Sequence, residues 1–168
     1  IKGCTSQKCW TEQSFINNLT KKTKNELKKY TFRPDGPNGR FEWLNTYNID
    51  NVMNQYEKKH QDFKYLGTVP MDFDSLDQLN IKNIDFKSLE KDNKKKIGIV
   101  FNLDESWKSG SHWVSLYSDI EKGNIYYFDS YGTKPEKRVR KLMRRIAKYC
   151  ESKGLKLDAD YNKVRHQY

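Results

Sequence analysis

The pattern of the sequence changes sharply at residues 97–103, where the chain reads Ile-Gly-Ile-Val-Phe-Asn-Leu. This short apolar run follows a cluster of lysines and is followed directly by Asp104 and Glu105. A short, continuous apolar segment with charged residues at both ends is typical of a buried strand. The chain is therefore expected to fold around a sheet that contains this strand.

The residues after this strand predict a hairpin. Residues 113–117 and 125–128 are rich in β-prone side chains, and Lys122-Gly123-Asn124 lies between them as a hairpin turn. The earlier segment 63–69 is apolar and aromatic and is expected to enter the same sheet.

A helix should follow the hairpin. Pro135 suits its first turn, and Gly154 lies where it should end. One apolar stripe runs along it, formed by Val139, Leu142, Met143, Ile146 and Tyr149. Residues 155–160 then predict another strand, with residues 164–167 as its exit. Strands flanked by helices place the chain in the α+β class.

The N-terminal third is predicted to be helical and separate. Thr11 is a plausible N-cap for a helix that continues to Tyr30, and the Pro- and Gly-rich residues 33–39 form a loop. We therefore divide the chain into an N-terminal helical region, residues 1–40, and a core, residues 41–168. Asp50 is predicted to cap a second helix over residues 51–60, and residues 72–96 suggest loops and short helical turns.

Composition narrows the classes of function. Of the 168 residues, 32% are charged, yet 14% are aromatic, which favours a folded core over disorder. No apolar run is long enough to cross a membrane, so no membrane partner is expected. Three cysteines form no even framework, which favours a reducing, intracellular compartment, and their spacing gives no metal site. The net charge of +10 fits either a well-solvated lysine-rich surface or attraction to nucleic acid or acidic proteins.

His112 and Asp129 are the candidate chemical groups. His112 immediately precedes one strand of the predicted hairpin, and Asp129 immediately follows the other. With the turn near Gly123, the two residues lie near one another at the open end of the hairpin. A carboxylate beside an imidazole orients the ring and stabilises its protonated form, as a protease base requires. The alternative is a structural histidine and an ordinary turn aspartate.

Several segments resemble one protease clan. Gly110–Leu116, which contains His112-Trp113, and Tyr127–Ser130, which contains Asp129, resemble the motifs of SUMO proteases and adenain, with the same interval of seventeen positions. A closer resemblance is to the polyprotein-processing proteases of the African swine fever virus type, found in giant DNA viruses. It includes the Cys4–Cys9 pair and the segments Trp43–Asn45, Asn48–Asp50, Met71–Phe73, Val100–Asp104 and Val164–Gln167.

The resemblance implies a papain-like cysteine protease core, a central mixed sheet flanked by helices. His112 would be the general base, Asp129 its orienting group and Gln167 an oxyanion-hole donor. Trp113 would pack beside the site and is the candidate substrate-binding residue. The nucleophilic cysteine would lie about five residues beyond Tyr168, so the 168-residue chain alone is expected to be inactive. Asp129 departs from the swine-fever-type enzymes, which have Asn there, and agrees with the SUMO proteases.

The function implied is a thiol endopeptidase that cleaves viral polyproteins or capsid precursors, after small residues such as Gly-Gly, during virion maturation. Two alternatives stay open: a protease of ubiquitin-like modifiers, and a non-catalytic basic module that binds nucleic acid or capsid protein. No metal or organic cofactor is expected, and DNA is a candidate activator. The expected location is the cytoplasmic viral factory of an infected cell and the virion.

Overall fold

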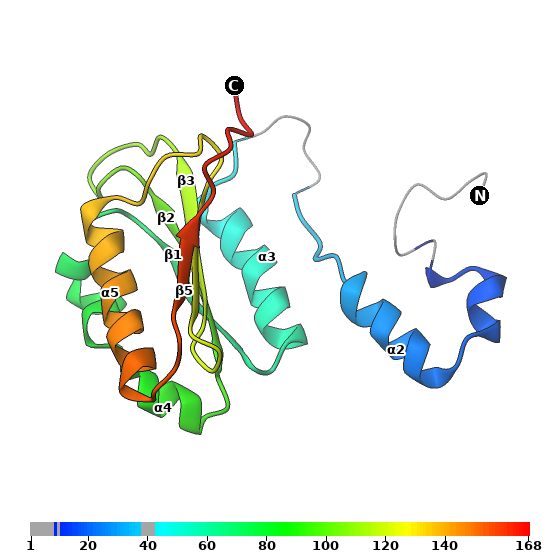
Figure 1. The fold of residues 1–168 in the computed structure, drawn as a ribbon. Helices are drawn as coiled ribbons and strands as arrows, with labels where there is room; N and C mark the ends of the chain where they lie inside the picture. The colour runs from blue at the N-terminus through cyan, green and yellow to red at the C-terminus, as the bar shows by residue number, and fades with distance from the viewer. Residues whose placement is uncertain (1–8, 10, 38–42) are drawn as a thin grey trace. The chain divides into compact units, whose positions relative to one another are not determined.

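The sheet has five strands in the computed structural model, which describes residues 9, 11–37 and 43–168. The strands lie side by side in chain order: β1 (Phe63–Val69), β2 (Lys96–Asn102), β3 (Trp113–Asp119), β4 (Asn124–Asp129) and β5 (Asp158–Tyr161). The outer pairs β1–β2 and β4–β5 are parallel, and the two inner pairs are antiparallel. Helix α3 (Thr46–Lys59) lies on one side of the sheet and α5 (Lys137–Ser152) on the other (Figure 1). The structure confirms the α+β class with a mixed sheet and flanking helices.

The β3–β4 hairpin forms where the sequence predicts it. Its register pairs Val114 with Asp129 at the open end and Asp119 with Asn124 beside the turn. Gly123 has a φ of +79°, which disfavours any residue with a side chain, and a Cβ there would lie 2.6 Å from the carbonyl oxygen of Lys156. This register leaves the residue before β3 at the same end of the sheet as the last residue of β4.

Helix α5 supplies one layer of the core. Glu136 is its N-cap and accepts a hydrogen bond from the backbone N–H of Arg138. Three residues of the predicted stripe, Val139, Leu142 and Ile146, are fully buried and belong to the same apolar cluster as the β2, β3 and β4 side chains. Full burial of such a side chain contributes about 1.5–3 kcal/mol, so this face fixes α5 against the sheet.

A long irregular stretch with three 3₁₀ turns and one short helix connects β1 to β2. It contains the 3₁₀ turns η2 (Phe73–Ser75), η3 (Asp77–Leu79) and η4 (Ile81–Asn83), and the short helix α4 (Phe86–Lys91). Phe73, Ile81 and Phe86 from this stretch are buried in the core. The predicted loops and short turns over residues 72–96 are confirmed.

The predicted start of α3 at residue 51 is wrong. The helix begins at Thr46, because Asn45 is its N-cap and forms a reciprocal capping box with Asn48. Asp50 lies inside the helix, and its carboxylate accepts hydrogen bonds from the Tyr65 hydroxyl at 2.8 Å and the Thr68 N–H at 3.1 Å. Asp50 thus attaches α3 to β1 and does not cap the helix.

The chain divides into two compact units, Ile1–Asn38 and Gly39–Tyr168. In the first unit, the single helix predicted from Thr11 to Tyr30 is wrong. It is divided into η1 (Ser14–Asn18) and α2 (Lys21–Tyr30), because the Thr20 side chain caps α2 by accepting from the Thr23 N–H. Among the described residues, no helix combines the length and apolarity that a membrane span requires.

Candidate active site

The His112 and Asp129 side chains are in direct contact. His112 Nε2 lies 2.7 Å from Asp129 Oδ1, and the two side chains are 12% and 1% exposed. The predicted hydrogen-bonding contact is confirmed. Because the carboxylate oxygen accepts, Nε2 carries the proton, and Nδ1 of the neutral ring is left with its lone pair. The pair can therefore hold an oriented imidazole whose second nitrogen is available to another group.

Asp129 is held by groups from three segments. Its Oδ1 also accepts from the Tyr131 N–H at 2.9 Å, and its Oδ2 accepts from the Thr133 hydroxyl. Asn162, just after β5, bonds the Asp129 backbone twice: its Oδ1 accepts from the N–H at 2.8 Å, and its Nδ2 donates to the C=O at 2.6 Å. A buried carboxylate needs such partners because an unpaired one is costly. The position of the Asp129 carboxylate is therefore set by these bonds and does not depend on His112.

These supporting residues were missed in the sequence. Tyr131 and Thr133 carry a recognisable signal, because an aspartate that follows a strand often bonds the backbone two residues later. Asn162 lies 33 positions from Asp129 and has no local signal. Only the parallel β4–β5 pairing brings it to the site.

Gln167 is anchored to the residue that follows Asp129. The Ser130 hydroxyl donates to Gln167 Oε1 at 2.7 Å, and the Ser130 carbonyl accepts from the N–H groups of His166 at 2.7 Å and Gln167 at 3.0 Å. With Oε1 engaged by Ser130, the amide NH₂ is the part of the Gln167 side chain that remains a donor. The segment that carries Gln167 is therefore fastened to the same end of β4 as Asp129.

Tyr131 packs on the face of the His112 imidazole. The two ring centroids are 4.4 Å apart with an interplanar angle of 28°. The Arg165 guanidinium lies over the Tyr131 ring, 5.5 Å from its centroid. Ring stacking restricts rotation of the imidazole in addition to the bond to Asp129. The His112 ring is thus held at one edge by Asp129 and on one face by Tyr131.

A cavity of about 450 Å³ opens beside the backbone that leads into His112. Trp113 forms part of its wall, and its indole N–H donates to the Leu44 carbonyl at 2.9 Å. Trp43, which sequence reasoning did not single out as a site residue, also lines the cavity and is 82% exposed. The remaining lining residues are Leu44, Asn45, Thr46, Thr68, Val69, Pro70, Asn102, Asp104, Glu105, Ser106, Lys108, Ser109, Gly110 and Ser111. The size is that of a small-ligand or peptide-side-chain site.

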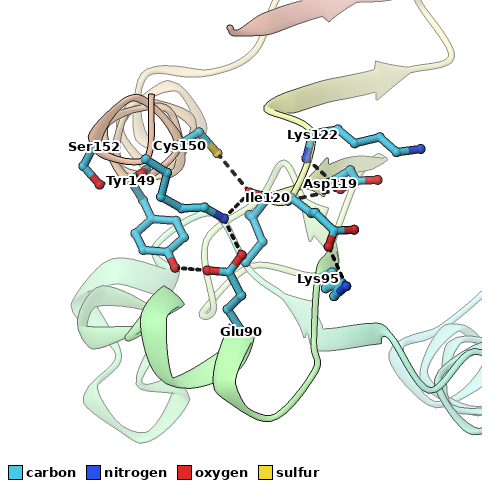
Figure 2. A network of polar contacts seen from close by, with 10 residues as sticks. Glu90, Lys95, Asp119, Ile120, Lys122, Tyr149, Cys150 and Ser152 are labelled. Atoms are coloured by element: carbon cyan, nitrogen blue, oxygen red, sulfur yellow. Dashed lines mark hydrogen bonds and ion pairs between the residues drawn. The ribbon is translucent and has the colours of Figure 1, made fainter. Parts of the chain in front are cut away.

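Cys150, the cysteine of the second unit, does not lie beside His112. Cys150 is fully buried near the end of α5, where its Sγ lies 3.8 Å from the Ile120 carbonyl oxygen (Figure 2). Burial raises the pKa of the Cys150 thiol, which makes it a poor nucleophile. Cys9 belongs to the N-terminal unit and is disulfide-bonded. Within the described ranges, no group of three or more metal-ligating side chains is present.

Comparison with known proteins identifies a protease family. Residues 42–156 match the Ulp1 protease family, C-terminal catalytic domain. A protein of Acanthamoeba polyphaga mimivirus that is named as a thiol protease is 34% identical over 168 residues, which are 99% of this chain and 56% of the mimivirus protein. The cysteine protease of African swine fever virus is 25% identical over 162 residues, 86% of this chain and 59% of that protein. The chain therefore spans less than three fifths of the length of either relative.

Solved structures show the same fold. The crystal structure of the African swine fever virus protease has a TM-score of 0.65 at 23% identity, over 98% of this chain and 66% of that one. The SUMO protease Ulp1 has a TM-score of 0.53 at 20% identity, over 92% of this chain and 78% of that one. The family match covers more than half of the chain, and the fold agrees with it. This chain belongs to the Ulp1 protease family of cysteine peptidases.

Proposed function

We propose that this chain carries the general base, the orienting carboxylate and the oxyanion donor of a cysteine endopeptidase. The observation that supports this most directly is the 2.7 Å contact between His112 Nε2 and the buried Asp129 carboxylate. It leaves Nδ1 of His112 as the nitrogen that faces a reacting thiol. The nucleophile is a cysteine that follows Gln167 in the longer protein, as the resemblance to swine-fever-type proteases implies.

The reaction is acyl transfer through a thioester. His112 Nδ1 removes the thiol proton, and the thiolate attacks the carbonyl carbon of the scissile peptide. The Gln167 side-chain N–H donates to the resulting oxyanion; one such donor is typically worth about 10²–10³ in rate. The imidazolium then protonates the leaving amine, and the peptide C–N bond breaks. His112 next removes a proton from water, which hydrolyses the thioester and restores the thiol.

The substrates proposed are viral polyproteins or capsid precursors cut after small residues such as Gly-Gly, in an infected cell and the virion. The virus relatives support this choice. The cavity beside His112, with Trp43 and Trp113 in its wall, offers a place for part of a peptide substrate. The likeness to Ulp1 favours one competing substrate class, ubiquitin-like modifiers, which the same assay separates.

The test uses the longer protein, extended past Tyr168 to include a cysteine after Gln167. We expect it to cleave Gly-Gly-containing peptides from a viral polyprotein, to lose activity on thiol alkylation, and to keep activity in a Cys150→Ala control. A fusion with a ubiquitin-like modifier is the competing substrate. Thiol-dependent hydrolysis by the 168-residue chain itself would contradict the assigned nucleophile, and faster cleavage of the modifier fusion would contradict the assigned substrate.

A basic face of α5 supports a role for DNA in location or activation. Lys137, Arg140, Arg144 and Lys148 are exposed and spaced by three or four residues, so they share one side of the helix. None of the four has an acidic partner among the described residues. We expect DNA affinity to fall steeply between about 50 and 200 mM salt, by roughly 10³–10⁵ for six to ten phosphate contacts. Affinity that is absent at low salt, or that does not change with salt, would contradict this role.

A further inference from the structure

The loop between β2 and β3 leads directly into His112, and its first half is held at several points. The Asp104 carbonyl accepts from the Met71 N–H at 2.9 Å. The Ser106 N–H and hydroxyl both donate to the Asp72 carboxylate, at 2.8 Å each. These bonds attach the loop to the segment that follows β1. The early part of the loop therefore has its own supports, independent of His112.

The second half of the loop, residues 109–111, is held differently. Among the described residues, one hydrogen bond connects this part to the rest of the protein: the Ser111 N–H donates to Asn102 Oδ1 at 3.2 Å. The same oxygen also accepts from the Asp104 N–H at 2.9 Å. One amide oxygen at the end of β2 thus joins both stems of the loop, immediately before His112.

Gly110 makes room for this arrangement. Its φ is +93°, and a Cβ at this position would lie 2.8 Å from Asn102 Nδ2. The loop therefore passes over the Asn102 amide at a distance that only glycine permits. The close approach and the two bonds to Oδ1 are separate observations, and both make Asn102 the support of the segment that enters His112.

We propose that Asn102 is a positioning residue for the candidate base, His112; the proposal rests on the proposed protease function. The His112 ring is held from the β4 side by Asp129 and Tyr131. Its backbone is held from the β2 side by the bond from the Leu103 N–H to the His112 carbonyl, 2.9 Å long, and by Asn102 through Ser111. Without Asn102, the imidazole stays bonded to Asp129, but the backbone that carries it loses one of its two supports on the β2 side, so the position of Nδ1 relative to a thiol is held less tightly.

The bonding pattern gives a direct test of this role. Asn102 uses its oxygen, an acceptor, for both loop bonds, so Asn102→Asp keeps the two contacts. Asn102→Leu keeps a branched side chain of the same reach but removes both contacts. Gly110→Ala keeps Asn102 but displaces its amide. In the longer, active protein we expect Asn102→Leu and Gly110→Ala to lose about 10- to 100-fold in kcat, because a misplacement of about 1 Å can cost 10²-fold. Asn102→Asp should stay near the parent.

Ser118→Ala is the matched control. The Ser118 hydroxyl donates to the Asn124 carbonyl at 2.9 Å, a bond between a side chain and the backbone at the other end of the same hairpin. We expect this variant to lower thermal stability without lowering kcat. In parallel, the imidazole NMR signals of His112 should shift in Asn102→Leu and stay in place in Ser118→Ala.

The outcomes separate the two proposals. A parent protein without thiol-dependent activity contradicts the proposed function, whereas His112 signals that stay unchanged in Asn102→Leu contradict the positioning role whatever the activity. An active parent whose Asn102→Leu variant keeps its kcat, or whose Asn102→Asp variant is as slow as Asn102→Leu, also overturns it. If Asn102→Leu does not fold, a Gly110→Ala variant with parental kcat gives the same contradiction.

Discussion

The two ends of the β3–β4 hairpin each carry a polar network, and the networks differ in which hydrogen-bonding groups they leave without a partner among the described residues. At the turn end, the Glu90 carboxylate accepts from the Tyr149 hydroxyl at 2.5 Å and pairs with Lys153. Lys153 Nζ also donates to the Ile120 carbonyl at 3.1 Å. Figure 2 shows Glu90, Tyr149 and Ile120 converging between α4, α5 and the end of β3. In this network, the Glu90, Tyr149 and Lys153 side chains all bond to other members of the network.

The open end of the hairpin is arranged differently. Asp129 is saturated by His112, Tyr131 and Thr133. His112 Nδ1 and the NH₂ of Gln167, in contrast, have no hydrogen bond among the described residues, and the neighbouring loop lines a cavity. A saturated network stabilises the fold, whereas one that keeps an acceptor and a donor unused can serve a reacting group. The comparison therefore separates a structural network from a candidate active site.

The largest effect is expected from His112→Ala in the longer protein. Removing the base should reduce kcat/KM by about 10⁴-fold or more, because the thiol then lacks a proton acceptor. Thermal stability should fall only moderately, because the buried Asp129 carboxylate keeps its bonds from Tyr131 and Thr133. Peptide hydrolysis and a thermal melt measure the two effects. If His112→Ala kept activity within tenfold of the parent, the open end of the hairpin would be no more catalytic than the turn end.

A smaller effect is expected from Asp129→Asn. The Asn oxygen can still accept from His112 and the Tyr131 N–H, and its NH₂ can donate to the Thr133 hydroxyl. The lost element is the negative charge that stabilises the imidazolium, so kcat/KM should fall about tenfold, which corresponds to about 1.4 kcal/mol. Peptide hydrolysis at one fixed pH, beside the parent and His112→Ala, measures the loss. A loss as large as that of His112→Ala would show that the charge, and not the orientation, is the main contribution.

The smallest effect on activity is expected at the other end, from Glu90→Gln. Hydrogen bonds from Lys153 and Tyr149 lower the pKa of Glu90 below its usual value, against the opposing effect of burial. Its carboxylate thus stabilises the fold above a pH of about 4.5, and this contribution is lost as the pH falls through the lowered pKa. Glu90→Gln should cost about 1–2 kcal/mol of unfolding free energy at neutral pH, and leave kcat unchanged.

The measurement is urea unfolding of both proteins at several pH values. The stability difference between parent and Glu90→Gln should shrink as the solution becomes more acidic. Tyr149, whose pKa burial and the Glu90 bond raise to about 12, stays neutral throughout this range. A stability difference that is constant with pH, or a lower kcat in Glu90→Gln, would show that the turn end is not a purely structural network.

Sequence patterns predicted the parts of the molecule that depend on near neighbours. The bounds of β1 match the predicted segment 63–69, and the hairpin turn at Gly123 was enough to place His112 near Asp129. The start of α3 was missed because two asparagines, Asn45 and Asn48, cap it together, and Asp50 seemed an equally good cap. Its true partners, on β1, are 15 and 18 residues away.

The supports of the site were harder to predict than the site itself. Ser130 and Gln167 are 37 positions apart, and their bond depends on the chain passing through α5 and β5 before it returns to the end of β4. Asn102 is an ordinary residue at a strand end in the sequence. Its significance depends on the path of the β2–β3 loop, which no local pattern specifies.

The two bonds between Asn162 and the Asp129 backbone can form only late in synthesis, after Asn162 has been added to the chain. The ribosome releases His112 and Asp129 first, and Asn162 follows 33 residues after Asp129. At about 5–20 residues per second, that interval lasts about 2 to 7 seconds. Until α5 and β5 have folded back, the aspartate lacks these two anchors. The nascent chain therefore contains His112 and Asp129 before it contains the residue that anchors the Asp129 backbone, and this delay follows from the position of β5 after α5 in the sequence.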